Sequence, residues 1–266
     1  MPRTDMAVVM GFPTLLPPLP EQRRLVDLLS RAEGIVRLRR EAQKKTAELI
    51  PALFLEMFGD PATNPKEWEL SRLGDEIVGF EGGHSPKAGE EGASPFRILK
   101  LSAVTGGVFK EVENKPAPKD YIPSYVQLVK VGDVLITRSN TSGLVGSVAI
   151  VRSVQDGILL SDLIWRIIFP DHCRINIEYV WALFQTKAIL SSISKLAIGT
   201  SDSMKKLSKG RFKELIVPIP PEHLQRKFAT KISNIESIQS QQITALAQAK
   251  AAFDALLDRI FHQEAA

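Results

Sequence analysis

A segment of about forty residues occurs twice in this chain, and such a repeat constrains the fold more than any other feature of the sequence. Near the N-terminus the sequence reads PPLPEQRRLV, and near the C-terminus it reads VPIPPEHLQRKF. When Gln22 is aligned with Gln225, one constant offset of 203 residues also aligns Phe58 with Phe261. A register kept without a gap predicts a duplicated structural unit, in which a proline-rich turn leads into a helix.

Both copies of the repeat carry a heptad pattern. In the second copy, positions spaced alternately by four and three residues are apolar, small or glutamine: Phe228, Ile232, Ile235, Gln239, Gln242, Leu246, Ala249, Phe253, Leu256 and Ile260. The matching positions of the first copy are Leu25, Leu29, Ala32, Val36, Arg39, Gln43, Thr46, Ile50, Leu53 and Met57. This spacing predicts a coiled-coil seam that is apolar at its ends and polar in its middle.

A single helix over residues 22–58 would be roughly 55 Å long at 1.5 Å per residue. A helix of that length needs a partner stripe to be stable, and the other copy of the repeat is the natural partner. Pairing with another chain is the alternative. Pro51 lacks a backbone donor and clashes with the preceding turn, so we expect a kink or break near Leu49. Periodicity does not distinguish a rigid spacer from an ordinary helical hairpin.

Between the two copies the chain changes character. Short runs typical of β-strands are separated by glycine, proline and asparagine: FRILKL, YVQLVKV, DVLITR, VGSVAIV and LIWRIIF. An amphipathic helical stretch follows at about residues 176–198. The segment 66–215 is therefore predicted to form a compact α+β domain.

Composition narrows the classes of protein to consider. The chain is 44% apolar and 24% charged, as in ordinary globular proteins. It contains no apolar run long enough for a membrane span and no signal-peptide pattern, so we expect a cytoplasmic protein. Net charge is +4 and the pI is near 9.1, which suits a nucleic-acid partner, although surface lysines chosen for solubility give the same totals.

No catalytic or metal-binding constellation is recognisable in the sequence. Cys173 is the single cysteine, and the four histidines never occur at metal-ligand spacing. Asp133 and Asp162 are too isolated for a metal nuclease, and phosphate-binding, dinucleotide-binding and amino-methyltransferase motifs are absent. We therefore expect no metal, no cofactor and no chemistry by this chain alone.

Two polar loops stand out instead, at residues 137–143 and 199–206. Arginine reads guanine and asparagine reads adenine through paired hydrogen bonds, while lysine contacts phosphate. The candidate DNA-binding residues are Lys100, Arg138, Ser139, Asn140, Thr141, Ser142, Thr200, Ser201, Ser203, Lys205, Lys206 and Lys209. The alternative is that loops commonly contain such residues, and that Arg138 is structural and pairs with Asp133 or Asp162.

The order of these features resembles the DNA-specificity (S) subunit of type I restriction-modification systems. The most specific matches are DVLITRSNTSGLVGSVAIV, GTSDSMKKLSKGRFKELIVPIPPEHLQRKF and the paired long helices. The resemblance implies an α+β fold, with one mixed α/β target recognition domain and two long helices in an antiparallel coiled coil. It divides the chain into a lead-in and proline turn (1–20), a first conserved helix (21–60), a recognition domain (61–215), and a second turn and helix (216–266).

The resemblance also implies a function and partners. A recognition domain reads one half of a bipartite site in double-stranded DNA, and the helices dock methyltransferase (M) subunits and, through them, the restriction (R) subunit. A full S subunit has two recognition domains, whereas residues 12–18 resemble only the tail of a first one, as at 212–218. A truncated gene, a fragment and a half-subunit acting as a homodimer all fit. A self-contained DNA-modifying enzyme and a coiled-coil assembly protein without a DNA role are the competing functions.

Overall fold

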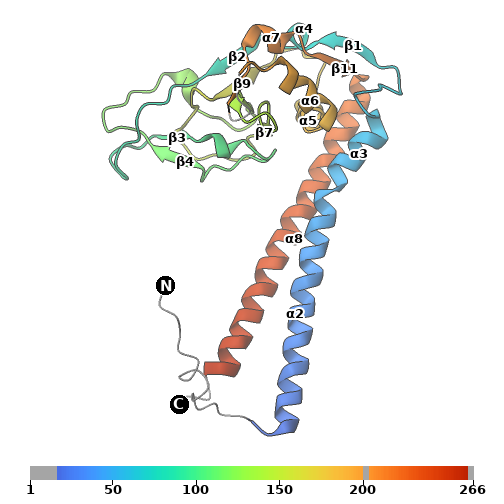
Figure 1. Ribbon diagram of the computed structural model, residues 1–266, viewed down its shortest axis with the longest axis vertical. Coiled ribbons are helices and arrows are strands. Elements are labelled where there is room, and N and C mark those ends of the chain that lie inside the picture. Colours follow the sequence, from blue (N-terminus) through green and yellow to red (C-terminus); the bar gives the residue numbers. More distant parts are fainter. Residues whose placement is uncertain (1–16, 200–203, 263–266) are drawn as a thin grey trace. The chain divides into compact units, whose positions relative to one another are not determined.

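The structure is a computed structural model that describes residues 17–199 and 204–262 (Figure 1). The chain divides into two compact units. In the described residues, the helical unit comprises 17–48 and 235–262, and the α+β unit comprises 49–199 and 204–234. The long helix α8 (Glu222–His262) contributes residues to both units.

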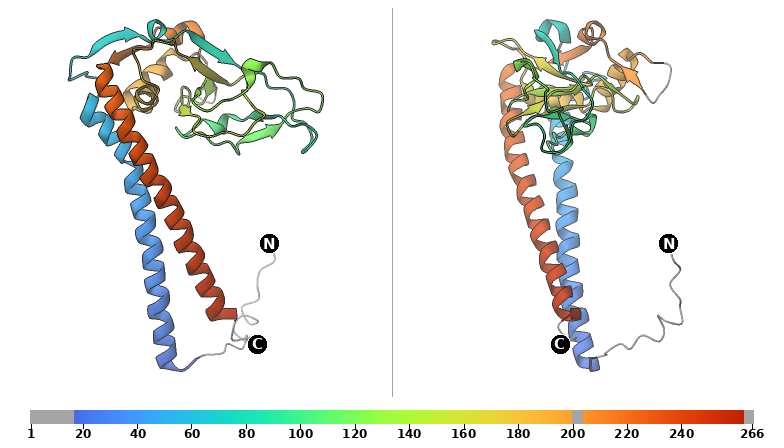
Figure 2. Two further views of the ribbon diagram at one scale, coloured as in Figure 1. Left: turned by 180° about the vertical axis from the view of Figure 1, so that it is seen from behind. Right: turned by 90° about the vertical axis from the view of Figure 1, so that its left-hand side faces the viewer.

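Two helices run antiparallel in the helical unit. They are α2 (Leu19–Ala47) and the part of α8 after residue 234, which lie side by side in Figures 1 and 2. Nε2 of Gln239 donates a hydrogen bond of 2.8 Å to the carbonyl oxygen of Thr46, which joins α8 to α2. The predicted antiparallel coiled coil is confirmed.

The predicted seam coincides with the less exposed positions of this unit. Buried or half-buried positions include Leu25, Leu29, Ala32, Val36, Gln43 and Thr46 on α2, and Ile235, Gln239, Gln242, Leu246, Ala249, Phe253, Leu256 and Ile260 on α8. Arg39 is the exception and is exposed, because a long charged side chain readily extends into solvent from the edge of an apolar seam. Oε1 of Gln242 is buried without a hydrogen-bond partner in the described part of the chain. The middle of the seam is therefore polar in the folded helices, as predicted.

The first predicted helix is broken at Glu48, where α2 ends and α3 (Leu49–Phe58) begins. Pro51 is thus the third residue of α3. The first N–H groups of a helix have no intrahelical acceptor, so a proline in the first turn removes no hydrogen bond. The break expected near Leu49 is confirmed.

Four antiparallel strands form the main sheet of the α+β unit. Their order is β2 (Gly79–Gly82), β9 (Ile164–Ile168), β5 (Val134–Thr137) and β7 (Val148–Ile150). The second sheet has the order β4 (Asn114–Pro116), β3 (Arg97–Leu99) and β8 (Ile158–Leu159), with β3 and β8 parallel. Buried side chains from both sheets, among them Leu99, Leu135 and Ile164, share one hydrophobic cluster.

Short elements complete the α+β unit. Two pairs of strands are separate from the sheets: β1 (Glu69–Arg72) with β11 (Ile216–Ile219), and β6 (Ser139–Asn140) with β10 (Lys205–Lys206). The α-helices are α4 (Leu73–Glu76), α5 (Ile177–Phe184), α6 (Lys187–Leu196) and α7 (Lys209–Lys213), and the 3-10 helices are η1 (Leu101–Ala103) and η2 (Tyr125–Gln127). The helix predicted at 176–198 is therefore two helices, and Thr186 caps the second one by accepting from the Ile189 amide.

A buried guanidinium lies at the centre of this unit. Arg166, on β9, forms ion pairs of 2.9 Å with Glu81 and 2.8 Å with Asp133. The same side chain donates to the carbonyl oxygens of Val126 and Leu128. Arg166 thus connects the main sheet to the segment that precedes residue 129.

The prediction of a strand at residues 125–131, YVQLVKV, is wrong. The chain forms η2 there, and only Leu128 makes an isolated β-bridge, to Leu159. Gln127 accepts from the Ser124 amide at 2.9 Å in a capping box, which favours a turn over an extended strand. Two carbonyls of this segment accept from Arg166, so a strand neighbour is not needed to satisfy them.

Four aromatic rings pack together where α3, α5 and the first turns of α8 meet. Phe54, Phe58, Tyr179 and Phe228 have ring centroids 4.9–5.8 Å apart. All four side chains are buried, so they form an aromatic core between these helices. In the described residues, no helix is long and apolar enough to cross a membrane.

The repeat offers a matched test of this aromatic core. Phe58 and Phe261 occupy the same position in the two copies, but Phe58 is buried and Phe261 is 67% exposed. We predict that Phe58→Ala lowers the free energy of unfolding by about 3–5 kcal/mol, whereas Phe261→Ala changes it by no more than about 0.5 kcal/mol. Denaturant titrations of the two variants measure both values, and equal losses would contradict the assigned core.

Candidate nucleic-acid interface

Several loops leave the main sheet at one end. The register pairs Gly82 with Trp165, Thr137 with Ile164, and Ile136 with Val148. The segments that follow β2 and β5 and those that precede β7 and β9 therefore all meet the main sheet at the same end of its strands, which we name the loop end. Because β3 is parallel to β8, Lys100 follows β3 on the side where residues 160–163 follow β8.

The short pair of strands β6 and β10 brings the two predicted polar loops together. Ser139 pairs with Lys206, and Asn140 pairs with Lys205. The Leu207 amide donates to the carbonyl oxygen of Arg138 at 2.8 Å and extends this contact by one residue. Two loops some sixty residues apart in sequence thus form one surface. The candidate residues Thr200, Ser201 and Ser203 lie outside the described residues.

Arg138 is largely occupied with contacts inside the α+β unit. Its guanidinium carbon lies 5.6 Å from the ring centroid of Trp165, and its Nη1 donates to the carbonyl oxygen of Asp162 at 3.3 Å. The ion pair with Asp133 that sequence left open does not form, because Asp133 pairs with Arg166. Nε of Arg138 is buried and has no partner in the described residues. Arg138 therefore holds residues 162–165 in place, and only part of its guanidinium remains for an external contact.

Other predicted candidates are also used internally. Lys209 donates to the carbonyl oxygen of Phe80 at 2.8 Å, and Lys205 donates to that of Gly199 at 2.9 Å. Asn140 donates to the hydroxyl of Thr105 at 3.1 Å and accepts from the Thr141 amide at 2.8 Å. Ser139 is buried. These side chains fix the shape of the loop end.

A smaller group keeps its polar atoms available. Lys100, Thr141 and Lys206 are exposed, and Ser142 is half-buried. Among the described residues, none of these four side chains makes a hydrogen bond or an ion pair. They are the members of the predicted set best placed to reach an external ligand.

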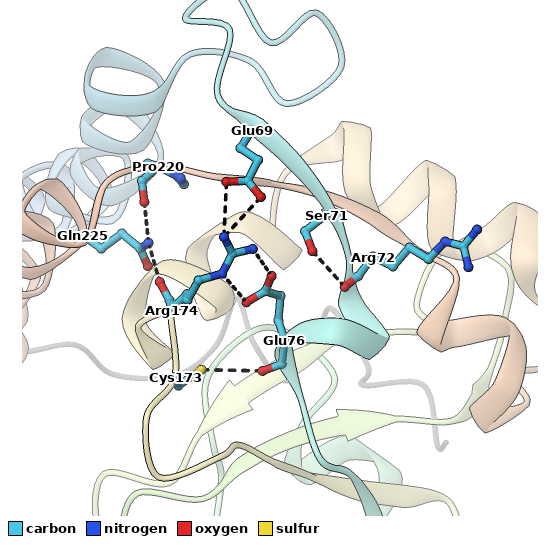
Figure 3. Close-up of polar contacts among 8 residues, drawn as sticks. All are labelled: Glu69, Ser71, Arg72, Glu76, Cys173, Arg174, Pro220 and Gln225. Carbon is cyan, nitrogen blue, oxygen red and sulfur yellow. Dashed lines mark hydrogen bonds and ion pairs between the residues drawn. The ribbon is translucent and has the colours of Figure 1, made fainter.

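A second cluster of polar contacts surrounds the turn that leads into α8 (Figure 3). Oε1 of Gln225 accepts from the Asn176 amide at 2.7 Å. Its Nε2 donates to the carbonyl oxygens of Arg174 at 3.0 Å and Pro220 at 2.7 Å. Tyr179 donates to the carbonyl oxygen of Pro218 at 2.7 Å. The proline turn is thus bound to the rest of the α+β unit mainly through main-chain atoms.

The first copy of the repeat contains the same local bond. Nε2 of Gln22 donates to the carbonyl oxygen of Pro17 at 2.7 Å, five residues back, as Gln225 does to Pro220. In the described part of the chain, Oε1 of Gln22 has no partner. The repeat therefore extends from sequence to side-chain geometry. The sequence showed the two glutamines, but the structure was needed to show what they do.

An ion-pair cluster stabilises the chain beside Gln225. Arg174 contacts Glu69 at 3.1 Å and Glu76 at 2.6 Å (Figure 3). Burial raises the pKa of Glu76, but hydrogen bonds from Arg174 and Ser71 and the Arg174 charge outweigh burial, so the pKa lies below its ordinary value of 4.5. Burial also raises the pKa of the Tyr179 phenol, which keeps that hydroxyl a donor.

Comparison with known proteins now identifies the family. A family model described as "Type I restriction modification DNA specificity domain" matches residues 65–249, which is more than half of the chain. The chain belongs to this family. The resemblance noted from its sequence motifs is confirmed.

Several relatives share this family. The EcoEI specificity subunit of the type I restriction enzyme from Escherichia coli is 27% identical over 254 residues, a match that covers 90% of this chain and 42% of that protein. The MjaVIII specificity subunit from Methanocaldococcus jannaschii is 24% identical over 255 residues, covering 90% of this chain and 58% of that protein. The chain thus spans about half the length of these relatives.

Solved structures show the same fold. The HsdS subunit from Thermoanaerobacter tengcongensis matches with a TM-score of 0.51 and 25% identity, over 92% of this chain and 59% of that one. A chain from a structure of a type I R-M system matches with a TM-score of 0.57 and 24% identity, over 92% of this chain and 60% of that one. The DNA specificity fold therefore accounts for both the sheets and the long helices.

The Glu76 carboxylate gives this specificity domain a predictable response to acid. Because its folded pKa is lowered, its contribution to stability is present above pH 4.5 and is lost as pH falls toward the folded value. We predict that Glu76→Gln is less stable than wild type at about pH 7. Between about pH 5 and about pH 3, its free energy of unfolding should fall less than that of wild type, because this range includes the pH at which the Glu76 carboxylate gains a proton. Urea titrations across this range measure the difference, with the exposed Glu90→Gln as control. Parallel curves for wild type and Glu76→Gln would contradict the assignment.

Proposed function

We propose that this chain is a non-catalytic DNA-specificity component of a type I restriction-modification complex. Its α+β unit reads one half of a bipartite sequence in double-stranded DNA, and its helices dock methyltransferase subunits and, through them, the restriction subunit. The observation that carries the proposal is the loop end, where β6 and β10 unite two polar loops in a domain of a DNA specificity family. The names of the relatives, which are specificity subunits, support it.

The competing proposal, an enzyme that modifies DNA by itself, finds less support. Within the described residues, no group of three or more His, Cys, Asp or Glu side chains could hold a metal ion. In the part of the chain that the structure describes, the basic side chains at the loop end bind carbonyl oxygens or are exposed, and none forms a pair with a nucleophile. Incubation of the pure chain with DNA and labelled S-adenosylmethionine separates the two proposals. Methyl transfer without an added methyltransferase subunit would overturn the non-catalytic one.

We place a second recognition domain at the other copy of the proline turn. In the second copy, Gln225, Phe228 and Ile232 are buried by the α+β unit. The aligned residues of the first copy, Gln22, Leu25 and Leu29, are only half-buried in the helical unit. The local Gln-to-Pro bond is already formed there. A domain with an amide and a carbonyl placed like those of Asn176 and Arg174 would complete it.

This arrangement predicts different costs for the two glutamines. Gln225→Ala leaves the Asn176 amide and the Arg174 carbonyl without a partner, which should cost about 1–3 kcal/mol of unfolding free energy. Gln22→Ala removes one local hydrogen bond and should cost about 0.5–1.5 kcal/mol. In a complex with methyltransferase and a second recognition domain, the two variants should weaken domain attachment alike. Thermal unfolding measures the first pair of values and native mass spectrometry measures the attachment, with the exposed Gln248→Ala as the control.

DNA binding predicts a salt signature. Lys206 is exposed at the loop end, so Lys206→Ala should weaken binding to all duplexes similarly and reduce the slope of log affinity against log salt by about one. Lys231→Ala, an exposed lysine of α8, should leave the slope unchanged. Fluorescence anisotropy with random-sequence duplexes over a salt series measures both. An unchanged slope for Lys206→Ala would show that this lysine is only a solvated surface residue.

A further inference from the structure

The segment after β2 is a DNA-contact candidate that the sequence patterns did not single out. Residues 83–89, with the sequence GHSPKAG, leave the main sheet at the loop end, directly after Gly82. Unlike an ordinary surface loop, this segment is fixed to its neighbours at several points along its backbone.

The first attachment is to the turn between β8 and β9. The Gly83 amide donates to the carbonyl oxygen of Ser161 at 3.1 Å, and the Ser85 hydroxyl accepts from the Asp162 amide at 3.2 Å. A Cβ atom at residue 83 would lie 1.7 Å from the carbonyl oxygen of Leu160, so only glycine fits. His84 is thus held between two residues that bind the main chain beside Asp162, whose carbonyl in turn accepts from Arg138.

The second attachment is to β4. Lys115 donates to the carbonyl oxygen of Pro86 at 2.8 Å, and the Gly89 amide donates to that of Pro116 at 3.0 Å. A Cβ atom at residue 89 would lie 2.3 Å from the carbonyl oxygen of Ala117. The segment is therefore closely packed at both of its ends, and the position of Lys87 between them is defined.

The side chains of this fixed segment contrast with its backbone. His84 and Lys87 are exposed, and in the described residues neither makes a hydrogen bond or an ion pair. The ammonium groups of Lys205 and Lys209, by comparison, donate hydrogen bonds to carbonyl oxygens. A rigid backbone that carries free polar side chains loses little conformational entropy on binding a ligand. The segment with free side chains ends before the acidic residues that follow it, of which Glu91 forms an ion pair of 2.8 Å with Arg97.

We propose that residues 84–87 form a preorganised DNA-contacting element, in which His84 meets a base edge and Lys87 meets a phosphate. An imidazole can donate to or accept from a base edge, and an ammonium group suits a phosphate oxygen. Lys115 is a positioning residue, because it fixes the Pro86 carbonyl and thereby the place of Lys87. This inference rests on the proposed DNA-reading function.

The test is selection from a pool of random-sequence duplexes by the full chain, followed by affinity measurements on the selected duplex and on a scrambled one. His84→Ala should lower affinity for the selected duplex by roughly 5- to 100-fold and affect the scrambled one little. Lys87→Ala should weaken both alike and reduce the salt slope by about one. Lys115→Met should weaken binding to both duplexes alike, as Lys87→Ala does, without changing the circular dichroism spectrum. Lys231→Ala is the control and should match wild type.

The possible results separate this inference from the function on which it rests. If wild type selects no duplex and shows no salt-dependent binding, the DNA-reading function fails and the contact element fails with it. If wild type binds selectively but His84→Ala and Lys87→Ala match it, only the contact element is overturned. Loss of fold in Lys115→Met would make that lysine structural, and the two exposed variants, His84→Ala and Lys87→Ala, would then decide the proposal alone.

Discussion

The buried guanidinium of Arg166 is the interaction on which the shape of the α+β unit depends. A buried charge is costly unless it is paired and hydrogen-bonded. Arg166 meets this condition through its two Nη atoms, while its buried Nε has no partner in the described residues. Glu81 and Asp133 provide the charges, and the carbonyl oxygens of Val126 and Leu128 take two further contacts. Arg166 therefore fixes the segment beside the second sheet relative to the main sheet. The loops that leave the main sheet inherit their positions from this arrangement.

Patterns with a strong local cause were predictable from sequence. The heptad seam, the break caused by Pro51 and the strands with alternating or apolar residues follow from periodicity and backbone sterics. Residues 125–131 were misread because their carbonyls bind Arg166, forty residues away for Val126, and a side chain so distant leaves no local mark. The contact of Arg138 with the Trp165 ring was likewise not predictable, because the two residues are distant in sequence.

The candidate interface shows how a basic loop divides its residues. In sequence, Lys205, Lys206 and Lys209 are equivalent cations. In the structure, Lys205 and Lys209 bind carbonyl oxygens, whereas Lys206 has no side-chain partner among the described residues. The strand pair β6–β10 has only two residues in each strand, which is too short for a periodic pattern to predict it from sequence. Long-range pairing thus determines which of the predicted residues keep their polar atoms available for an external ligand. The close contacts of Gly83 and Gly89 identify residues 83–89 as a fixed segment, which composition does not distinguish from an ordinary turn.

Gln225 has a consequence for how such proteins diversify. Its amide binds one N–H and two carbonyl groups of the main chain. Every residue has a carbonyl group and every residue except proline has an N–H, so substitutions of side chains leave these partners intact. The attachment therefore depends little on which side chains the α+β unit carries. Substitutions in the polar loops of the α+β unit can therefore accumulate while the joint to α8 persists. A single amide side chain thus secures the start of α8 without constraining the side chains around it.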